Sequence, residues 1–182
     1  MTAKEVAFVR NMRELGVLEE IAGHRLQQEN GVILVTCADG DQFSDIFRHQ
    51  QGLMSRNVRG RNRIHVFSWN GGPLRIAANS PANTDGSTFE LDAIQDIRDA
   101  SAMKGIRTVV LCAHAPCGKA HAHNVSVEET IRLLIAAQRR LKQEVSELTV
   151  ADFFHVRYPD DMRARSYFVN AEKWAKRFAA RN

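Results

Sequence analysis

The sequence predicts one α/β domain of three layers, α/β/α, in which helices flank a mostly parallel central sheet and a helical arm precedes it. Continuous apolar runs rich in β-branched residues alternate along the chain with amphipathic segments, as expected where strands buried on both faces alternate with helices. The chain has 182 residues, 44% of them hydrophobic, enough for one sizeable core. We therefore expect a single domain over residues 1–182, with the arm at 1–30 and the α/β core at 31–182.

The first half of the chain supplies the arm and two strands. Residues 3–28 have apolar side chains near helical spacing, with Gly16 able to interrupt the helix. The run at 32–36 predicts a central parallel strand, and a short helix is expected at 42–51. A second strand is expected at Ile64–Trp69, and the Asn-Gly-Gly-Pro segment that follows predicts a tight turn.

The second half repeats the alternation. Ser87 and Glu90 have the spacing of a capping box, which predicts a helix leading into a strand at 108–113. Ser126 and Glu129 have the same spacing and open a longer helix. A last strand is expected at 150–156. In a terminal helix that Asn170 can cap, Trp174 and Phe178 share one face.

Potential metal ligands follow two of these strands. Cys37-Ala-Asp39 comes after the run at 32–36, and His114-Ala-Pro-Cys117-Gly118 comes after the run at 109–113. Open α/β sheets bind ligands at the carboxyl ends of their strands, so the two segments are expected to meet there. Two thiolates and an imidazole with a carboxylate nearby suit zinc. The sequence therefore predicts a zinc site at Cys37, His114 and Cys117, beside Asp39.

The third cysteine has a different interpretation. Cys112 lies between Leu111 and Ala113 inside a predicted strand, so we interpret it as a small buried hydrophobe. Three cysteines without an export signal do not favour a disulfide framework. Since there is neither a long apolar run nor a signal-peptide pattern, we expect a cytoplasmic protein that does not act on membranes.

The basic residues do not predict a nucleic-acid partner. The net charge is +4, and the densest basic stretch consists of Arg56, Arg59, Arg61 and Arg63. Clustered cations can neutralise phosphates. This stretch, however, has no interleaved aromatic residues and is rich in Gly and Asn, so we interpret it as a solvated surface loop. A Gly-rich phosphate loop after a strand is also missing from the sequence.

The two ligand segments resemble the Cys-x-Asp-x-Arg and His-x-x-Cys-Gly motifs of the β-class carbonic anhydrases. The resemblance spans about residues 31–145, and Phe67-Ser-Trp-Asn70-Gly-Gly72 stands where that family has Arg-Asn-Ala-Gly. It implies one Zn²⁺ per chain, held by Cys37, His114 and Cys117. Asp39 is then either the fourth ligand or a catalytic hydrogen-bond partner of the zinc-bound water.

The activity implied by the resemblance is the reversible hydration of CO2 to bicarbonate. Zinc in such a site lowers the pKa of bound water toward ~7, and the resulting hydroxide attacks CO2. A relative of the family acting on carbonyl sulfide or carbon disulfide is an alternative. The resemblance also implies assembly into a homodimer or a higher homo-oligomer.

One residue departs from the family motif. The motif arginine, which pairs with the aspartate and draws it off the metal, is replaced here by Asp41. Without that partner Asp39 can close the metal site, which predicts a catalytically silent zinc protein as the alternative to the enzyme. Arg48 or an arginine of the basic stretch could replace the missing cation. Asp41 could itself act as the N-cap of the helix at 42–51.

Two histidines near the second motif also have two interpretations. His121 and His123 could transfer protons from a zinc site, because imidazole titrates near neutrality. They could equally be exposed loop residues before the helix that opens at Ser126. The sequence does not decide between these roles.

Overall fold

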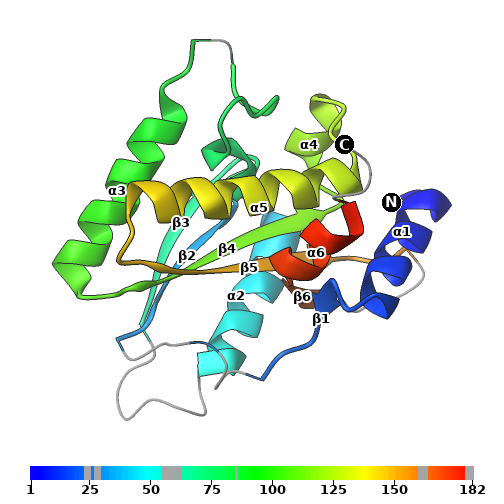
Figure 1. The fold of residues 1–182 in the computed structure, drawn as a ribbon, viewed down its shortest axis with the longest axis horizontal. Helices are drawn as coiled ribbons and strands as arrows, with labels where there is room; N and C mark the ends of the chain where they lie inside the picture. The colour runs from blue at the N-terminus through cyan, green and yellow to red at the C-terminus, as the bar shows by residue number, and fades with distance from the viewer. Residues whose placement is uncertain (23–25, 27–29, 55–62, 85, 160–163, 179–182) are drawn as a thin grey trace.

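The computed structural model describes residues 1–22, 26, 30–54, 63–84, 86–159 and 164–178. Its strands form one six-stranded sheet in the order β1-β6-β5-β4-β2-β3 (Figure 1). Four neighbouring strands are parallel: β2 (Val32–Cys37), β3 (Ile64–Trp69), β4 (Thr108–Ala115) and β5 (Thr149–Val156). β6 (Arg165–Val169) runs antiparallel to β5, and β1 (Leu18–Glu19) antiparallel to β6. The predicted, mostly parallel sheet is confirmed.

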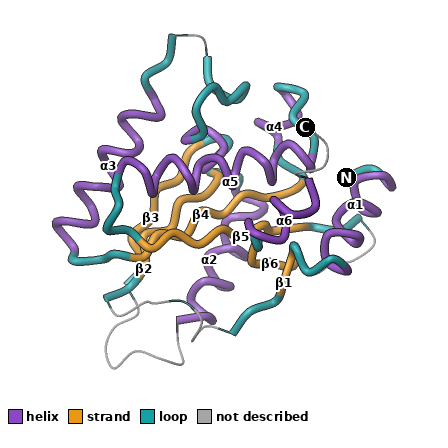
Figure 2. The backbone as a smooth tube through the Cα atoms, in the orientation of Figure 1, coloured by secondary structure: helices purple, strands orange, loops and turns teal. Residues whose placement is uncertain are grey.

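Helices cover both faces of this sheet, as Figure 2 shows, so the three-layer prediction is confirmed as well. On one face lie α3 (Phe89–Lys104), α5 (Val127–Glu144) and α6 (Ala171–Phe178), which bury their apolar side chains in the larger core cluster. On the other face α2 (Gly40–Met54) packs Ile46 and Met54 against Val110 and Phe153. Two short helices, η2 (Gly72–Ile76) and α4 (Gly118–Ala122), follow the carboxyl ends of β3 and β4.

The N-terminal helix is present but shorter than predicted. α1 (Ala3–Glu14) begins with a reciprocal capping box between Thr2 and Glu5 and ends before Gly16, whose φ is 65°. At Leu18 and Glu19 the helix prediction is wrong, because both residues pair with β6. The extended backbone there buries the Leu18 side chain in the core, while its backbone pairs with β6. The part of the prediction at 23–25 and 27–29 lies outside the described residues.

The end of the chain also holds a strand that was not predicted. β5 is not the last strand, since β6 follows it and joins it to β1. After β6, the Asn170 side chain accepts a hydrogen bond from the Lys173 N–H at 3.1 Å and caps α6 as predicted. The rings of Trp174 and Phe178 stack with centroids 4.1 Å apart.

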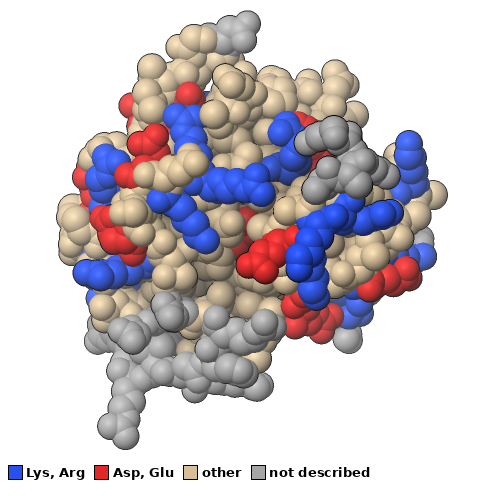
Figure 3. All heavy atoms as spheres, in the orientation of Figure 1, with Lys and Arg blue, Asp and Glu red and all other residues tan. Residues whose placement is uncertain are grey.

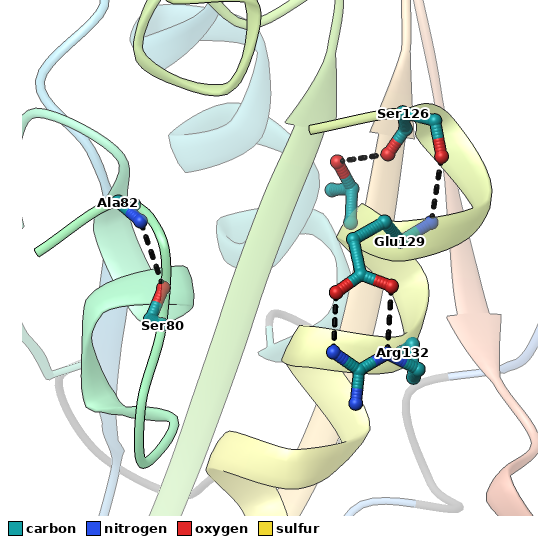
Figure 4. A network of polar contacts seen from close by, with 6 residues as sticks. Ser80, Ala82, Ser126, Glu129 and Arg132 are labelled. Carbon is teal, nitrogen blue, oxygen red and sulfur yellow. Dashed lines mark hydrogen bonds and ion pairs between the residues drawn. The ribbon is translucent and has the colours of Figure 1, made fainter. Parts of the chain in front are cut away.

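The two predicted capping boxes are only partly realised. At α5 the Ser126 hydroxyl accepts from the Glu129 N–H at 3.1 Å, while the Glu129 carboxylate binds Arg132 (Figure 4). At α3 the N-cap is Thr88, and the Ser87 hydroxyl accepts instead from the Phe89 N–H at 3.2 Å. The sequence therefore predicts both helix starts to within two residues, while only the Ser126 half of the capping box at α5 forms as expected.

The surface of the α5 face carries charges of both signs. Lys and Arg side chains lie among Asp and Glu side chains there (Figure 3). Arg56, Arg59 and Arg61 lie outside the described residues, so the surface-loop interpretation of the basic stretch stays a prediction. Within the described part of the chain, no helix has the length and apolar character needed to cross a membrane.

Candidate metal centre

The fold brings the three predicted ligands together. β2 and β4 are parallel neighbours, so their carboxyl ends meet at one edge of the sheet. Cys37 is the last residue of β2, His114 lies near the end of β4, and Cys117 immediately precedes α4. The two sulfurs and a His114 ring nitrogen all lie within 4.8 Å of one another, and all three residues are buried. Both strands reach further than predicted and include the first ligand of each motif.

The buried imidazole of His114 fits a metal ligand. This residue is 2% exposed, and neither ring nitrogen has a hydrogen-bond partner among the described residues. A buried polar group without a partner is costly, and such groups usually have a structural or chemical reason. A metal bound to one nitrogen would supply that reason. Two thiolates and an imidazole form a donor set that zinc prefers.

The two candidate ligand cysteines form a hydrogen-bonded pair. A hydrogen bond from the Cys117 thiol lowers the pKa of Cys37 against the opposing effect of burial, and His114 and the Gly71 amide lower it further. The same hydrogen bond, together with burial, raises the pKa of Cys117. Cys37 is therefore the better preformed thiolate. A metal that binds both sulfurs must displace the remaining proton.

Cys112 lies apart from this cluster. It is fully buried in the apolar layer beneath α2, where burial raises the pKa of its thiol. The interpretation as a small buried hydrophobe is confirmed.

Asp39 lies beside the three ligands. Its Oδ2 is 4.0 Å from the His114 Nε2, and its Oδ1 accepts a hydrogen bond from the Asp41 N–H at 3.0 Å. The Asp39 carbonyl accepts from the N–H groups of Gln42 and Phe43 at the start of α2. Asp41 is inside the first turn of α2, so its prediction as the N-cap is wrong. The residue before the helix that receives these bonds is Asp39.

The arginines considered as replacements for the motif cation bind elsewhere where the structure describes them. Arg48 pairs with Asp45 at 3.2 Å, and Arg63 donates to the Lys104 carbonyl at 2.9 Å. A different arginine lies at this edge of the sheet. The guanidinium of Arg157, one residue beyond β5, donates to the Asp41 carbonyl at 2.6 Å. Arg157 is not among the residues predicted from the sequence, in which its only signal is a place just after a predicted strand.

A cavity of about 630 Å³ adjoins the centre. His114, Pro116 and Cys117 line it from the β4 side, and Met1, Thr2 and Glu5 line it from the N-terminal side. His121 lines it as well; this histidine is exposed and belongs to α4 rather than to a loop. His123 is partly buried at the C-cap of α4.

Comparison with known proteins finds similarity at the level of solved structures. No family model matches the sequence, and no curated protein matches it. The beta-carbonic anhydrase isoform I from Trichomonas vaginalis is 11% identical, with a TM-score of 0.49 over 93% of this chain and 99% of that chain. The beta-carbonic anhydrase CafD of Aspergillus fumigatus is 12% identical, with a TM-score of 0.48 over 84% and 99%. A carbonic anhydrase from Streptococcus mutans is 15% identical, with a TM-score of 0.46 over 93% and 99%.

Proposed function

We propose that this protein is a zinc-dependent, β-carbonic-anhydrase-like lyase that catalyses the reversible hydration of CO2 to bicarbonate. The observation that carries the proposal is the convergence of Cys37, His114 and Cys117 at the carboxyl edge of the sheet. The buried, unpartnered imidazole of His114 supports it within the described residues. Zinc held there supplies a Lewis acid that lowers the pKa of water toward ~7.

The chain's own groups have distinct tasks in this proposal. The Gly71 amide orients the Cys37 sulfur by donating a hydrogen bond to it at 3.3 Å. Asp39, whose Oδ2 faces the His114 ring, orients the reacting water as a hydrogen-bond acceptor. His121 lines the adjoining cavity and moves the released proton toward solvent. The burial of the two sulfurs and the imidazole keeps competing water away from the metal ligands.

A second candidate, a catalytically silent zinc protein, is favoured by the surroundings of Asp39. Among the described residues no lysine or arginine forms an ion pair with its carboxylate, and Arg48 and Arg157 bind other groups. Within the described part of the chain, no cation then draws this carboxylate away from the metal. A centre with Asp39 as its fourth ligand has no open position and acts structurally.

Stopped-flow CO2 hydration by the zinc-loaded protein at neutral and alkaline pH separates the two candidates. CO2 turnover supports the lyase. One tightly bound zinc per chain with no turnover at any pH excludes the lyase and supports the catalytically silent zinc protein. Carbonyl sulfide and carbon disulfide are tested in parallel as alternative substrates.

Asp41→Arg is the sharper variant, because it restores the cation of the family motif beside Asp39. If Asp39 closes the metal site because the motif cation is absent, this change should create or greatly raise CO2 hydration. Asp41→Asn, which removes the negative charge without adding a cation, is the matched control. Equal activity of both variants would mean that the absence of the motif arginine does not limit turnover.

The proposal extends to assembly into at least a homodimer. β3 forms an edge of the sheet and keeps most of its side chains only half-buried, which supports a further contact along that strand. Light scattering coupled to size-exclusion chromatography measures the assembly directly, and a monomer at micromolar concentration would contradict this part of the proposal.

A further inference from the structure

Arg157 joins the two segments that form the metal centre. Its backbone N–H donates to the Ala115 carbonyl at 2.9 Å, directly after the ligand His114. Its guanidinium donates to the Asp41 carbonyl at 2.6 Å, two residues after Asp39. Arg157, one residue beyond β5, thus connects the end of β4 to the first turn of α2.

The guanidinium of Arg157 is itself held in place from α2. Its Nη2 lies 3.7 Å from the Asp45 carboxylate, which also pairs with Arg48 at 3.2 Å. The Arg157 side chain is 41% exposed, so this ion pair adds little to the stability of the fold. The Asp45 carboxylate instead holds the Arg157 guanidinium in a defined position, where it can donate to the Asp41 carbonyl.

The bond to Asp41 acts on Asp39 through the turn. With its carbonyl held by Arg157, Asp41 donates its N–H to the Asp39 Oδ1 at 3.0 Å. With Oδ1 bound in this way, the other carboxylate oxygen, Oδ2, lies 4.0 Å from the His114 Nε2. The Asp39 carboxylate therefore accepts a hydrogen bond from the Asp41 N–H, and the Arg157 guanidinium binds the carbonyl of the same Asp41.

We propose that Arg157 is a positioning residue of the metal centre, which fixes the Asp39–Asp41 turn through its backbone and so sets the place of the Asp39 carboxylate beside the metal. Because the guanidinium binds the carbonyl of Asp41 rather than the carboxylate of Asp39, it steadies the turn without drawing Asp39 away. The inference rests on the proposed zinc site but not on CO2 turnover.

Cobalt(II) in place of zinc provides the test, because its visible spectrum reports the ligands of the bound ion. Arg157→Ala should change the cobalt spectrum whether Asp39 binds the ion or its water. If Asp39 is the fourth ligand, the variant should also weaken cobalt affinity by about 10- to 100-fold, the range found when the groups that orient a metal's ligands are removed. Arg157→Lys, which keeps a cationic donor, should recover part of both effects. Arg48→Ala is the matched control, since it removes the other cation on Asp45 and leaves the bond to Asp41 in place.

A double variant shows whether Arg157 acts through Asp39. In an Asp39→Ala background, Arg157→Ala should leave the cobalt spectrum unchanged, whereas a purely structural role would alter it in both backgrounds. A wild-type spectrum and affinity in Arg157→Ala, or equal effects of Arg48→Ala and Arg157→Ala, would overturn the inference. If the protein binds cobalt with the expected spectral changes but hydrates no CO2, the lyase proposal fails and the role of Arg157 stands.

Discussion

The backbone N–H of Gly71 donates a hydrogen bond to the Sγ of Cys37 at 3.3 Å, in a buried contact between the turn after β3 and the last residue of β2. The turn reaches this position through two glycines with positive φ, 87° at Gly71 and 50° at Gly72. A Cβ on Gly72 would lie 2.6 Å from the Cys37 nitrogen, a backbone atom that cannot move aside. The Cys37 thiol, a proposed metal ligand, is therefore oriented by a turn that only glycine permits.

Gly72→Ala should consequently damage both the fold and the metal site. The left-handed backbone alone costs a non-glycine residue about 1–2 kcal/mol of unfolding free energy, and the clash with the Cys37 backbone adds to it. Gly105→Ala is the matched control, because Gly105 has a φ of 63° but open space where a Cβ would stand. Urea unfolding and zinc competition with a chelator measure the two effects. Equal losses of stability and unchanged zinc affinity in both variants would contradict this account of the turn.

The three cysteines allow a direct test of the ligand assignment. Zinc that binds only the folded protein stabilises it by about 2.7 kcal/mol at a free concentration of 100 Kd, so zinc loading should raise the melting temperature. Cys37→Ser and Cys117→Ser should abolish that rise. Cys112→Ala should lower the baseline stability, since it leaves a small void beneath α2, yet keep one zinc per chain. Metal analysis by mass spectrometry and thermal melts with and without a chelator give the result, and loss of zinc from Cys112→Ala would refute the assignment.

The central part of the fold was readable from the sequence because its signals are long and consistent. The runs that became β2, β4 and β5 are buried along nearly their whole length, and this produces continuous apolar stretches. Parallel strands bring their carboxyl ends to one edge, so the convergence of Cys37 and His114 followed from topology. The thiol and imidazole side chains at this edge then predicted a zinc site.

The features that were missed depend on contacts that leave little trace in a sequence. β1 has two residues and β6 has five, and both lie at or near the antiparallel edge, where pairing rather than periodicity decides the conformation. The contact from Arg157 to Asp41 ends on a backbone carbonyl, which every residue type offers. Only the strand order places this arginine beside the turn, and the sequence alone does not give that order.

Asp152 is a buried acid whose titration opposes folding. It lies in β5 with 0% exposure, and neither carboxylate oxygen has a hydrogen-bond partner among the described residues. Burial raises its pKa well above the ordinary value, and Lys142 opposes the shift. The folded protein therefore favours the protonated acid, in line with the high cost of an isolated buried charge.

The pH dependence of stability follows from the sign of this shift. The contribution of Asp152 is fully present below its unfolded pKa, about 3.9, and is lost as the pH rises through the raised folded value, at about 1.4 kcal/mol per pH unit. Asp152→Asn keeps the shape but does not ionise, so it should match the wild type near pH 4 and unfold at higher urea concentration near pH 8. Asp96→Asn, on the exposed face of α3, should show no such gain. Urea unfolding at a series of pH values measures the difference, and an Asp152→Asn curve parallel to the wild type from pH 4 to pH 8 would show that the carboxyl finds a partner or solvent in the folded protein.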